Sequence, residues 1–270
     1  MSNDNKITKT NDGYVVELFA KSKKEITEEI IDVSEGVCLL DIVPSKTEEQ
    51  QFLIYKEIVE KMEDSPVIIK TLEKGKDEEL LKVQLKALLR AGKYGDLSVV
   101  FPKISTIEEL KEYKDILEVC KIELKSKDIS YKNHIKTGIV VEIPSAALMS
   151  YELSRECDFL FIETNSLTSY TFGKNTNGSQ TAIIKLIKET TEGAHDAGIF
   201  CGICGDIVEN ELYIPLLIGL GIDEFSMDAK NIDKVRNVIS TLDKYDCKEL
   251  AEEVFALRSI EEIEKKLKQF

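Results

Sequence analysis

The sequence has no long apolar run, because no stretch reaches the roughly 18–20 residues that a membrane-spanning helix needs. Its first residues, MSNDNKITKTNDG, are polar and lack the apolar core of a secretory signal. The six cysteines are scattered along the chain, a pattern typical of reduced thiols in a reducing compartment. These features predict a cytoplasmic protein that does not contact a membrane.

Basic residues are fewer than acidic residues. The chain has 36 lysines and arginines against 50 aspartates and glutamates, which gives a formal net charge of −14. This balance argues against a nucleic-acid partner, because phosphate backbones attract basic surfaces. It argues equally against strong electrostatic attraction of an anionic substrate. The simplest interpretation of the acidity is solubility.

Glycine and proline are few, 14 and 5 in 270 residues, and no linker or low-complexity stretch divides the chain. Short apolar runs rich in β-branched residues alternate with amphipathic stretches, which predicts a parallel sheet with intervening helices. The expected strands are 14–20, 36–42, 67–72, 97–101, 137–142, 159–164, 200–205 and 224–227. The expected helices are 26–31, 48–62, 78–91, 107–124, 145–156, 181–197, 211–220 and 232–242, with one or two more in 248–270. Eight strand–helix units at this length predict one α/β domain over 1–270, a (β/α)₈ TIM barrel with a C-terminal helical extension.

Polar residues follow two neighbouring strands of the expected barrel, and such strand ends are where barrels carry their chemistry. Glu142 follows one strand, and the run from Glu163 to Ser166 follows the next. Glu142 offers a carboxylate to Mg²⁺, which takes one or two carboxylates together with substrate oxygens. Ser166 offers only a hydroxyl where a second carboxylate is needed, and Glu163 would face the other way on a continuing strand. The alternative interpretation of Glu142 is a solvated strand end.

Cys204 closes the expected strand 200–205 between two glycines that permit close backbone approach. A thiol there can serve as an acid, a base or a nucleophile, although the residues alone favour a small buried apolar role. Cys201 and Cys204 lie three apart on a strand and face opposite sides, so neither redox nor zinc use is expected. His134 and His195 have no serine or cysteine partner in the sequence, which leaves a catalytic triad unsupported.

Two long segments resemble a known family. The segment GIVVEIPSAALMSYELSRECDFLFIETNSLTSYTF resembles the C-terminal barrel of Enzyme I of the bacterial phosphoenolpyruvate-dependent sugar phosphotransferase system. That family shows G-[IV]-M-[IV]-E-x-P-[AS]-A followed by D-F-F-S-I-G-T-N-D-L-T-Q-Y-T. The segment HDAGIFCGICGDIVENELYIPLLIGLGIDEFSMDA resembles its H-x-x-G-x-x-x-G-M-C-G-E-x-A-G-D and L-L-x-G-x-G-x-D-E-F-S-M-S motifs. Residues 36–40, 48–55, 67–75 and 101–102 also correspond, so the resemblance covers nearly the whole chain.

The resemblance implies a barrel that binds phosphoenolpyruvate and Mg²⁺ and passes the phosphoryl group to a histidine on a separate domain. Under it, Glu142 would be a metal ligand, and Asn165 would contact the ligand. Lys70 stands at the position of a ligand-binding arginine, and Cys204 would be the acid that protonates the enolate. The resemblance also implies a homodimer, with phosphotransferase-system proteins or a separate phosphohistidine domain as partners.

The chain departs from the family at several ligand-holding positions. Ser166 replaces the metal-binding aspartate, Asp41 stands where an arginine belongs, and Val43 replaces a nearby glutamate. The loop after Gly75 is shortened, and residues 175–178 lack the arginine of the family's D-R-G-N. Arginine forks and Mg²⁺ neutralise phosphoenolpyruvate, and each charge-assisted hydrogen bond contributes about 1.5–3 kcal/mol. The combined loss is on the order of 5–10 kcal/mol, although such terms do not add simply.

We therefore predict a degenerate, free-standing Enzyme I-like barrel with a regulatory or scaffolding role and without phosphoenolpyruvate-dependent phosphotransfer. Its Mg²⁺ binding would be weak or absent. Two alternatives remain open at this point. One is a Mg²⁺-dependent enzyme acting on phosphoenolpyruvate or a related oxo-acid, which the retained Glu142, Lys70, Asn165 and Cys204 favour. The other is phosphotransfer to a histidine on a partner chain.

Overall fold

The structure, a computed structural model, describes residues 8–21, 28–39, 47–75, 77–173 and 181–270. Its centre is a closed barrel of eight parallel strands in which each strand pairs with the next along the chain. The strands are β2 (Val15–Lys21), β3 (Gly36–Leu39), β4 (Val67–Lys70), β5 (Leu97–Phe101), β6 (Lys136–Val141), β7 (Phe159–Glu163), β8 (Phe200–Cys204) and β9 (Glu224–Met227). Parallel pairing of β2 with β9 closes the barrel, and β1 (Thr8–Lys9) adds antiparallel to β2. The predicted (β/α)₈ barrel is confirmed.

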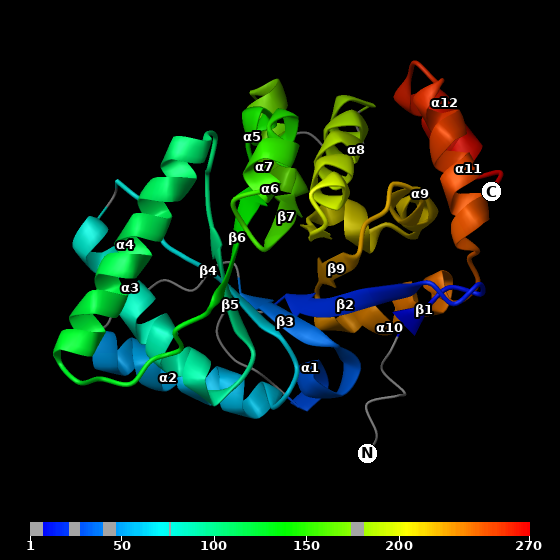
Figure 1. Cartoon of the computed structure of the whole chain (residues 1–270). Coiled ribbons are helices and arrows are strands. Elements are labelled where there is room, and N and C mark those ends of the chain that lie inside the picture. The colour runs from blue at the N-terminus through cyan, green and yellow to red at the C-terminus, as the bar shows by residue number, and fades with distance from the viewer. Residues whose placement is uncertain (1–7, 22–27, 40–46, 76, 174–180) are drawn as a thin grey trace.

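Helices surround the strands (Figure 1). They are α1 (Glu28–Val33), α2 (Glu48–Met62), α3 (Glu78–Ala91), α4 (Ile107–Ser126), α5 (Pro144–Leu148), α6 (Ser150–Ser154), α7 (Thr164–Phe172), α8 (Thr181–Asp196), α9 (Ile214–Gly219), α10 (Ala229–Ile239), α11 (Lys244–Phe255) and α12 (Ile260–Leu267). Short 3₁₀ turns cover Gly92–Tyr94, Asp206–Glu209 and Glu211–Tyr213. The terminal pair α11 and α12 forms the predicted helical extension, on the opposite side of the barrel from α2, α3 and α4 (Figure 1).

Several elements have the bounds that the sequence predicts, and others differ. The strands 97–101 and 224–227 and the helices 48–62 and 78–91 match. The expected helix 145–156 is divided into α5 and α6, because the backbone at Met149 leaves helical geometry (φ −103°, ψ 18°). Helix α7 has no counterpart among the expected elements, and it begins directly after β7. Residues 40–42 of an expected strand lie outside the described residues.

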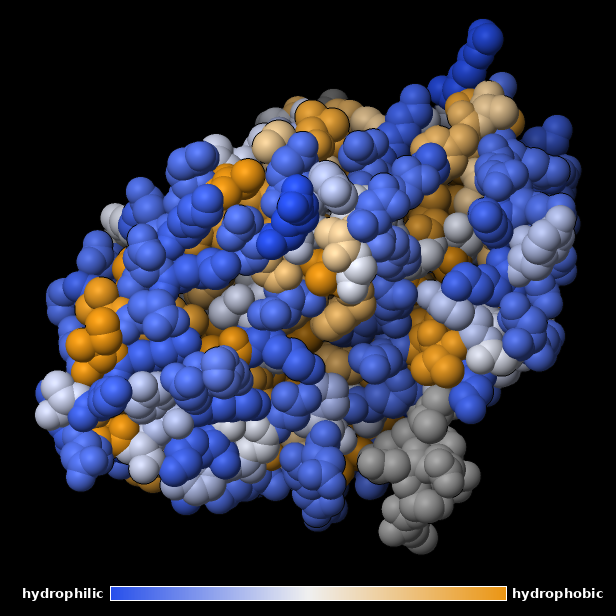
Figure 2. All heavy atoms as spheres, in the orientation of Figure 1, coloured by the Kyte–Doolittle hydropathy of each residue, from blue (hydrophilic) through white to orange (hydrophobic). Residues whose placement is uncertain are grey.

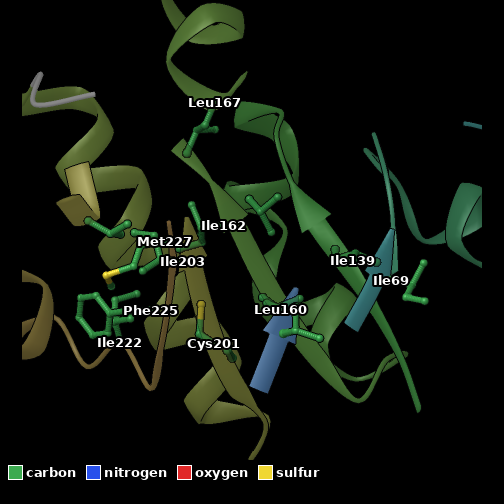
Figure 3. Close-up of a cluster of buried hydrophobic side chains, with 14 of the residues drawn as sticks. Ile69, Ile139, Leu160, Ile162, Leu167, Cys201, Ile203, Ile222, Phe225 and Met227 are labelled. Carbon is green, nitrogen blue, oxygen red and sulfur yellow. The ribbon is translucent and has the colours of Figure 1, made fainter. Parts of the chain in front are cut away.

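The outward-facing side chains of the strands form the main core between barrel and helices. Figure 3 shows Ile139, Leu160 and Ile203 of this layer, each fully buried, on neighbouring strands. Parallel strands covered by helices bury both faces, which explains their nearly continuous apolar runs. Phe225 and Met227 extend the same layer onto β9, where the barrel closes (Figure 3).

Aromatic rings fill much of the barrel interior, and three of them lie over a glycine on the adjacent strand. The three ring–glycine pairs are Phe19 with Gly36, Phe159 with Gly138, and Phe161 with Gly202. A Cβ atom at Gly138 would lie 2.5 Å from the Phe159 ring, closer than real contacts allow. The interior is therefore packed with side chains and is not a channel, as expected for an eight-stranded barrel.

Hydrophilic residues cover most of the face that Figure 2 shows, with apolar side chains dispersed among them. Within the described ranges, no helix is both long enough and apolar enough to cross a membrane.

Candidate functional site at the mouth of the barrel

Glu142 lies at the carboxyl end of β6 with only 4% of its surface exposed. Its Oε2 atom accepts a hydrogen bond of 3.0 Å from the backbone N–H of Lys103. Its Oε1 atom lies 3.7 Å from Nζ of Lys70, the last residue of β4. Burial raises the pKa of Glu142 above its usual range, and Lys70 opposes that rise. The structure thus places two of the sequence-predicted site residues in contact.

Lys103 is a site residue that sequence reasoning missed. It follows β5, and its backbone adopts a left-handed conformation (φ 54°). Non-glycine residues in this region are uncommon and cluster at functional sites. Its Nζ atom lies 3.1 Å from Oε2 of Glu73, and this hydrogen bond raises the pKa of Lys103. The only signal in the sequence is a Pro-Lys pair at a strand end.

Glu163 ends β7, and the chain turns into α7 at the next residue. Its two carboxylate oxygens accept hydrogen bonds from the backbone N–H groups of Asn165 (3.1 Å) and Ser166 (2.8 Å). The expectation that Glu163 faces away from Ser166 on a continuing strand is therefore wrong, because the strand does not continue. Glu163 also lies close enough to Glu142 to contribute to the raised pKa of that residue.

Asn165 belongs to the first turn of α7, where it connects the ends of β7 and β8. Its Nδ2 atom donates to Oδ1 of Asp206 (3.1 Å), and the N–H of Asp206 donates to its Oδ1 (3.2 Å). Beside it, the Thr164 hydroxyl donates to the carbonyl of Cys204 (2.9 Å). Gly205 has a positive φ of 111°, and a Cβ there would collide with Thr164. This packing holds the first turn of α7 in place.

Cys204, the last residue of β8, is fully buried in the barrel interior and lies in register with Glu163 at the end of β7. Cys201 belongs to the outer layer between β8 and the helices (Figure 3). The two sulfur atoms therefore face opposite sides of the strand, as the spacing predicts. None of the six cysteines forms a disulfide. Burial raises the pKa of the Cys201 and Cys38 thiols, which keeps both protonated.

The mouth is the end of the barrel formed by the carboxyl ends of the strands, where Lys70, Glu142 and Glu163 lie. A divalent cation there would need oxygen atoms that are not already held in hydrogen bonds or ion pairs. Both oxygens of Glu142 face a donor or a cation, both oxygens of Glu163 accept backbone N–H groups, and Ser166 offers only a neutral hydroxyl. Among the described residues, no three His, Cys, Asp or Glu side chains are arranged to hold a metal ion. This donor set does not fit Mg²⁺ in the arrangement that the structure shows.

Arginine is absent from the mouth. The chain has four arginines, all within the described residues: Arg90, Arg155, Arg236 and Arg258. Arg90 in α3 pairs with Glu48 and Glu49 of α2 on the outside of the barrel. Arg236 in α10 binds Asp233 and the first strand. Arg155 follows α6 and Arg258 precedes α12, away from the carboxyl ends of the strands. Asp41, Val43 and residues 175–178 lie outside the described residues.

The two histidines lie at the opposite end of the barrel. His195, at the end of α8, has Nε2 at 2.8 Å from Oδ2 of Asp223, and this hydrogen bond raises the pKa of His195. The same carboxylate accepts from the backbone N–H of Cys201 (2.8 Å) and from the hydroxyl of Tyr14 (3.2 Å). His134 precedes β6. Neither histidine reaches the mouth, so the structure shows no histidine-based chemistry there.

Solved structures share the fold. A citrate lyase from Burkholderia xenovorans superposes with a TM-score of 0.64 at 12% identity, over 93% of this chain and 89% of that one. A malate synthase from Haloferax volcanii superposes with a TM-score of 0.62 at 14% identity, over 90% of this chain and 80% of that one. At such low identity these similarities show the barrel architecture alone.

Sequence comparison identifies closer relatives. A phosphoenolpyruvate-protein phosphotransferase from Priestia megaterium is 34% identical over 253 residues, covering 80% of this chain and 44% of that protein. The corresponding protein from Staphylococcus carnosus is 33% identical over 301 residues, covering 94% of this chain and 52% of that protein. The chain thus spans about half the length of these curated relatives. The family described as "PEP-utilising enzyme, PEP-binding domain" matches residues 75–244, more than half of the chain. The chain therefore belongs to the PEP-binding domain family of phosphoenolpyruvate-utilising enzymes.

Proposed function

We propose that this barrel derives from an Enzyme I-like phosphoenolpyruvate-binding domain, has lost phosphotransfer, and serves a regulatory or scaffolding role. One observation carries the proposal. The buried carboxylate of Glu142 and the lysine at the family's arginine position, Lys70, are engaged with each other, with 3.7 Å between Oε1 and Nζ. In a working site the carboxylate would hold a metal and the cation would hold the ligand.

The charges at the mouth support the same conclusion. Two lysines, Lys70 and Lys103, each face a carboxylate partner. Glu163 adds a further negative charge, as does Asp206 beside it. Phosphoenolpyruvate carries nearly three negative charges at neutral pH, so every one of these carboxylates opposes it. Lysine also lacks the planar fork with which arginine holds a phosphate or a carboxylate.

The partners follow from the family. We propose that residues 1–270 act as one barrel domain that forms a homodimer in the cytoplasm. Its partners would be phosphotransferase-system proteins or a separate phosphohistidine domain. The relatives are phosphoenolpyruvate-protein phosphotransferases, and this supports a partner from the same system.

The test is calorimetric titration of phosphoenolpyruvate into the protein with and without Mg²⁺. We expect no saturable heat at millimolar ligand in either case. Ser166→Asp restores the family carboxylate and serves as the matched variant. It should not restore binding, because the arginines and the Lys70–Glu142 pair are unchanged.

Two outcomes would overturn the proposal. The first is Mg²⁺-dependent binding by the wild-type protein in the micromolar to low-millimolar range. The second is transfer of phosphate from phosphoenolpyruvate to a histidine-bearing partner domain. Full binding by Ser166→Asp alone would show that the arginine positions do not matter, and the physical argument above would then be wrong.

A further inference from the structure

Three buried oxygen atoms on β9 have no hydrogen-bond partner among the described residues. They are both carboxylate oxygens of Glu224 and the hydroxyl oxygen of Ser226. Glu224 is 1% exposed, and Ser226 is fully buried. Buried polar groups in folded proteins almost always have a partner, which is often an ordered water or an ion. Three such oxygens on one strand therefore indicate a small bound species that completes them.

The alternation of side chains along β9 directs both residues into the barrel. Phe225 and Met227 lie in the outer layer between the strands and the helices (Figure 3), so residues 224 and 226 take the opposite face. Ser226 is in register with Cys204 of β8, which belongs to the interior cluster. Two positions along a strand separate Cα atoms by roughly 7 Å, so one small species between the two side chains can contact both.

Glu224 is surrounded by groups that carry no positive charge. Burial raises its pKa, and Glu17 and Asp223 raise the pKa further. The thiols of Cys38 and Cys201 lie close enough for Glu224 to raise their pKa values as well. No lysine, arginine or histidine of the described residues offsets its charge. An ionised carboxylate at this depth needs a counter-charge, and the described part of the chain does not supply one.

The chemistry of the three oxygens selects the species. Carboxylate and hydroxyl oxygens are hard ligands, which suit hard cations. Among the described residues, no three His, Cys, Asp or Glu side chains are arranged to hold a metal ion, and Glu224 supplies a single negative charge. A divalent cation would keep excess charge and lack ligands. A water molecule would satisfy the hydrogen bonds but leave the carboxylate without a counter-charge. A monovalent alkali cation meets both requirements.

Glu17 marks the side from which a cation can approach. It is exposed at the amino-terminal end of the barrel, in register with Glu224 across the pairing of β2 with β9. Burial and Asp223 raise the pKa of Glu17, whereas Lys136 opposes that rise. Carboxylates on adjacent strands create a negative potential that attracts cations from solvent.

We propose that Glu224 and Ser226 bind one monovalent alkali cation, Na⁺ or K⁺, inside the barrel near its amino-terminal end. The ion gives the three oxygens a partner and compensates the charge of Glu224. It stabilises β9, whose pairing with β2 closes the barrel. The proposal goes beyond the proposed function, because this site is separate from the mouth and does not depend on the loss of phosphotransfer.

The experiment is urea denaturation of the full chain in sodium, potassium and tetramethylammonium chloride at equal ionic strength and mildly alkaline pH. Equal ionic strength keeps charge screening constant, and tetramethylammonium is too bulky for a buried site. Glu224→Gln and Ser226→Ala each remove part of the site. Ser154→Ala is the matched control, because the Ser154 hydroxyl is also buried and unpartnered among the described residues but belongs to α6, outside the barrel.

Sodium or potassium should raise the folding equilibrium constant of the wild-type protein by at least about tenfold over tetramethylammonium. This is the gain expected when the ion is present at roughly ten times its dissociation constant. Glu224→Gln should lose the gain, Ser226→Ala should lose part of it, and Ser154→Ala should keep it. The larger gain identifies the resident ion. Wild-type crystals soaked in thallium(I), which has the same charge, should show an anomalous-scattering peak between Glu224 and Ser226.

Equal stability of the wild-type protein in the three salts would overturn the proposal, since a proton or a water would then suffice for Glu224. A gain of the same size in Glu224→Gln would also overturn it, because the ion would bind elsewhere. If Glu224→Gln does not fold, Ser226→Ala and the thallium(I) crystals decide. An unchanged gain in Ser226→Ala together with no peak at the site shows that the proposal is wrong.

Discussion

Lys70 and Glu142 reach each other across the mouth from the ends of β4 and β6, with 3.7 Å between Nζ and Oε1. The Glu142 side chain is 5% exposed and the Lys70 side chain 20% exposed. Removing such charges from water is costly, and their attraction offsets that cost only while both partners are present. The pair therefore stabilises the mouth in its present arrangement and opposes the separation that a bound metal and a bound phosphate would require.

Removing one partner of this pair should destabilise the protein more than removing both. Lys70→Met leaves the Glu142 carboxylate buried without its cation, and we expect the free energy of unfolding to fall by about 1–3 kcal/mol. The double variant Lys70→Met/Glu142→Gln should recover most of that loss. Urea denaturation of the two single variants and the double variant gives the coupling energy directly.

Lys188→Met is the control for this cycle. It breaks the exposed pair between Lys188 and Glu192 in α8, where both side chains are at least 40% exposed. Its effect should stay within about 0.5 kcal/mol, as for most exposed pairs. A double variant at the mouth that is no more stable than Lys70→Met would show that Glu142 does not depend on Lys70.

Glu224 should make the stability of the barrel depend on pH. It is 1% exposed, and neither carboxylate oxygen has a hydrogen-bond partner among the described residues. Burial raises its pKa well above the usual range, and Glu17 and Asp223 raise it further. A carboxyl whose pKa is higher in the folded state does not lower the free energy of unfolding at acid pH, because it is protonated in both the folded and the unfolded state. Above the unfolded value the cost grows by about 1.4 kcal/mol per pH unit until the folded pKa is reached.

Glu224→Gln removes this cost. The free energy of unfolding of the variant should match that of the wild-type protein at about pH 4. The variant should become increasingly more stable than the wild-type protein as the pH rises from there to the folded pKa of Glu224. Guanidinium denaturation across this range measures the difference. Glu118→Gln, at an exposed position of α4, should show no such trend. A stability gap that is constant with pH would mean that Glu224 ionises in the folded protein as it does in the unfolded chain.

Gly138 should tolerate no side chain while Phe159 stands opposite it. The packing leaves 2.5 Å between an added Cβ and the Phe159 ring, so Gly138→Ala must displace the ring. Such overpacking costs about 1–3 kcal/mol of unfolding free energy. Gly138→Ala/Phe159→Leu should be more stable than Gly138→Ala alone, although Phe159→Leu by itself leaves a cavity. If adding Phe159→Leu to Gly138→Ala lowers the unfolding free energy further, the ring and the glycine do not pack as described. Thermal unfolding measures both effects.

Helix α7 and the Glu163 carboxylate show where prediction from the sequence ends. The segment 164–172 has no apolar stripe at helical spacing, and its buried residues are two threonines and Leu167. Its helical form depends on the Glu163 cap and on the contacts of its first turn with β8. A cap formed by the last residue of a strand gives no periodic signal, so the sequence predicts a strand that ends at 164 and no helix over 165–172.

The sequence by itself determined the alternation of strands and helices, the closed barrel, and the family. Each of these depends on local periodicity or on long motifs, and both are present in the order of the residues. It also determined that Cys201 and Cys204 face opposite sides, since strand geometry fixes that for any two residues three apart.

Only the tertiary structure decided which groups of the chain contact one another at the mouth. The contact between Lys70 and Glu142, the hydrogen bond from the Lys103 backbone, and the cap by Glu163 join residues from different strands or depend on where a strand ends. Strand periodicity says which face a side chain takes, but the register of neighbouring strands and the closure of the barrel decide which side chain it meets. The fold can therefore be predicted from patterns along the chain, whereas the contacts within its site depend on how the strands pack against one another.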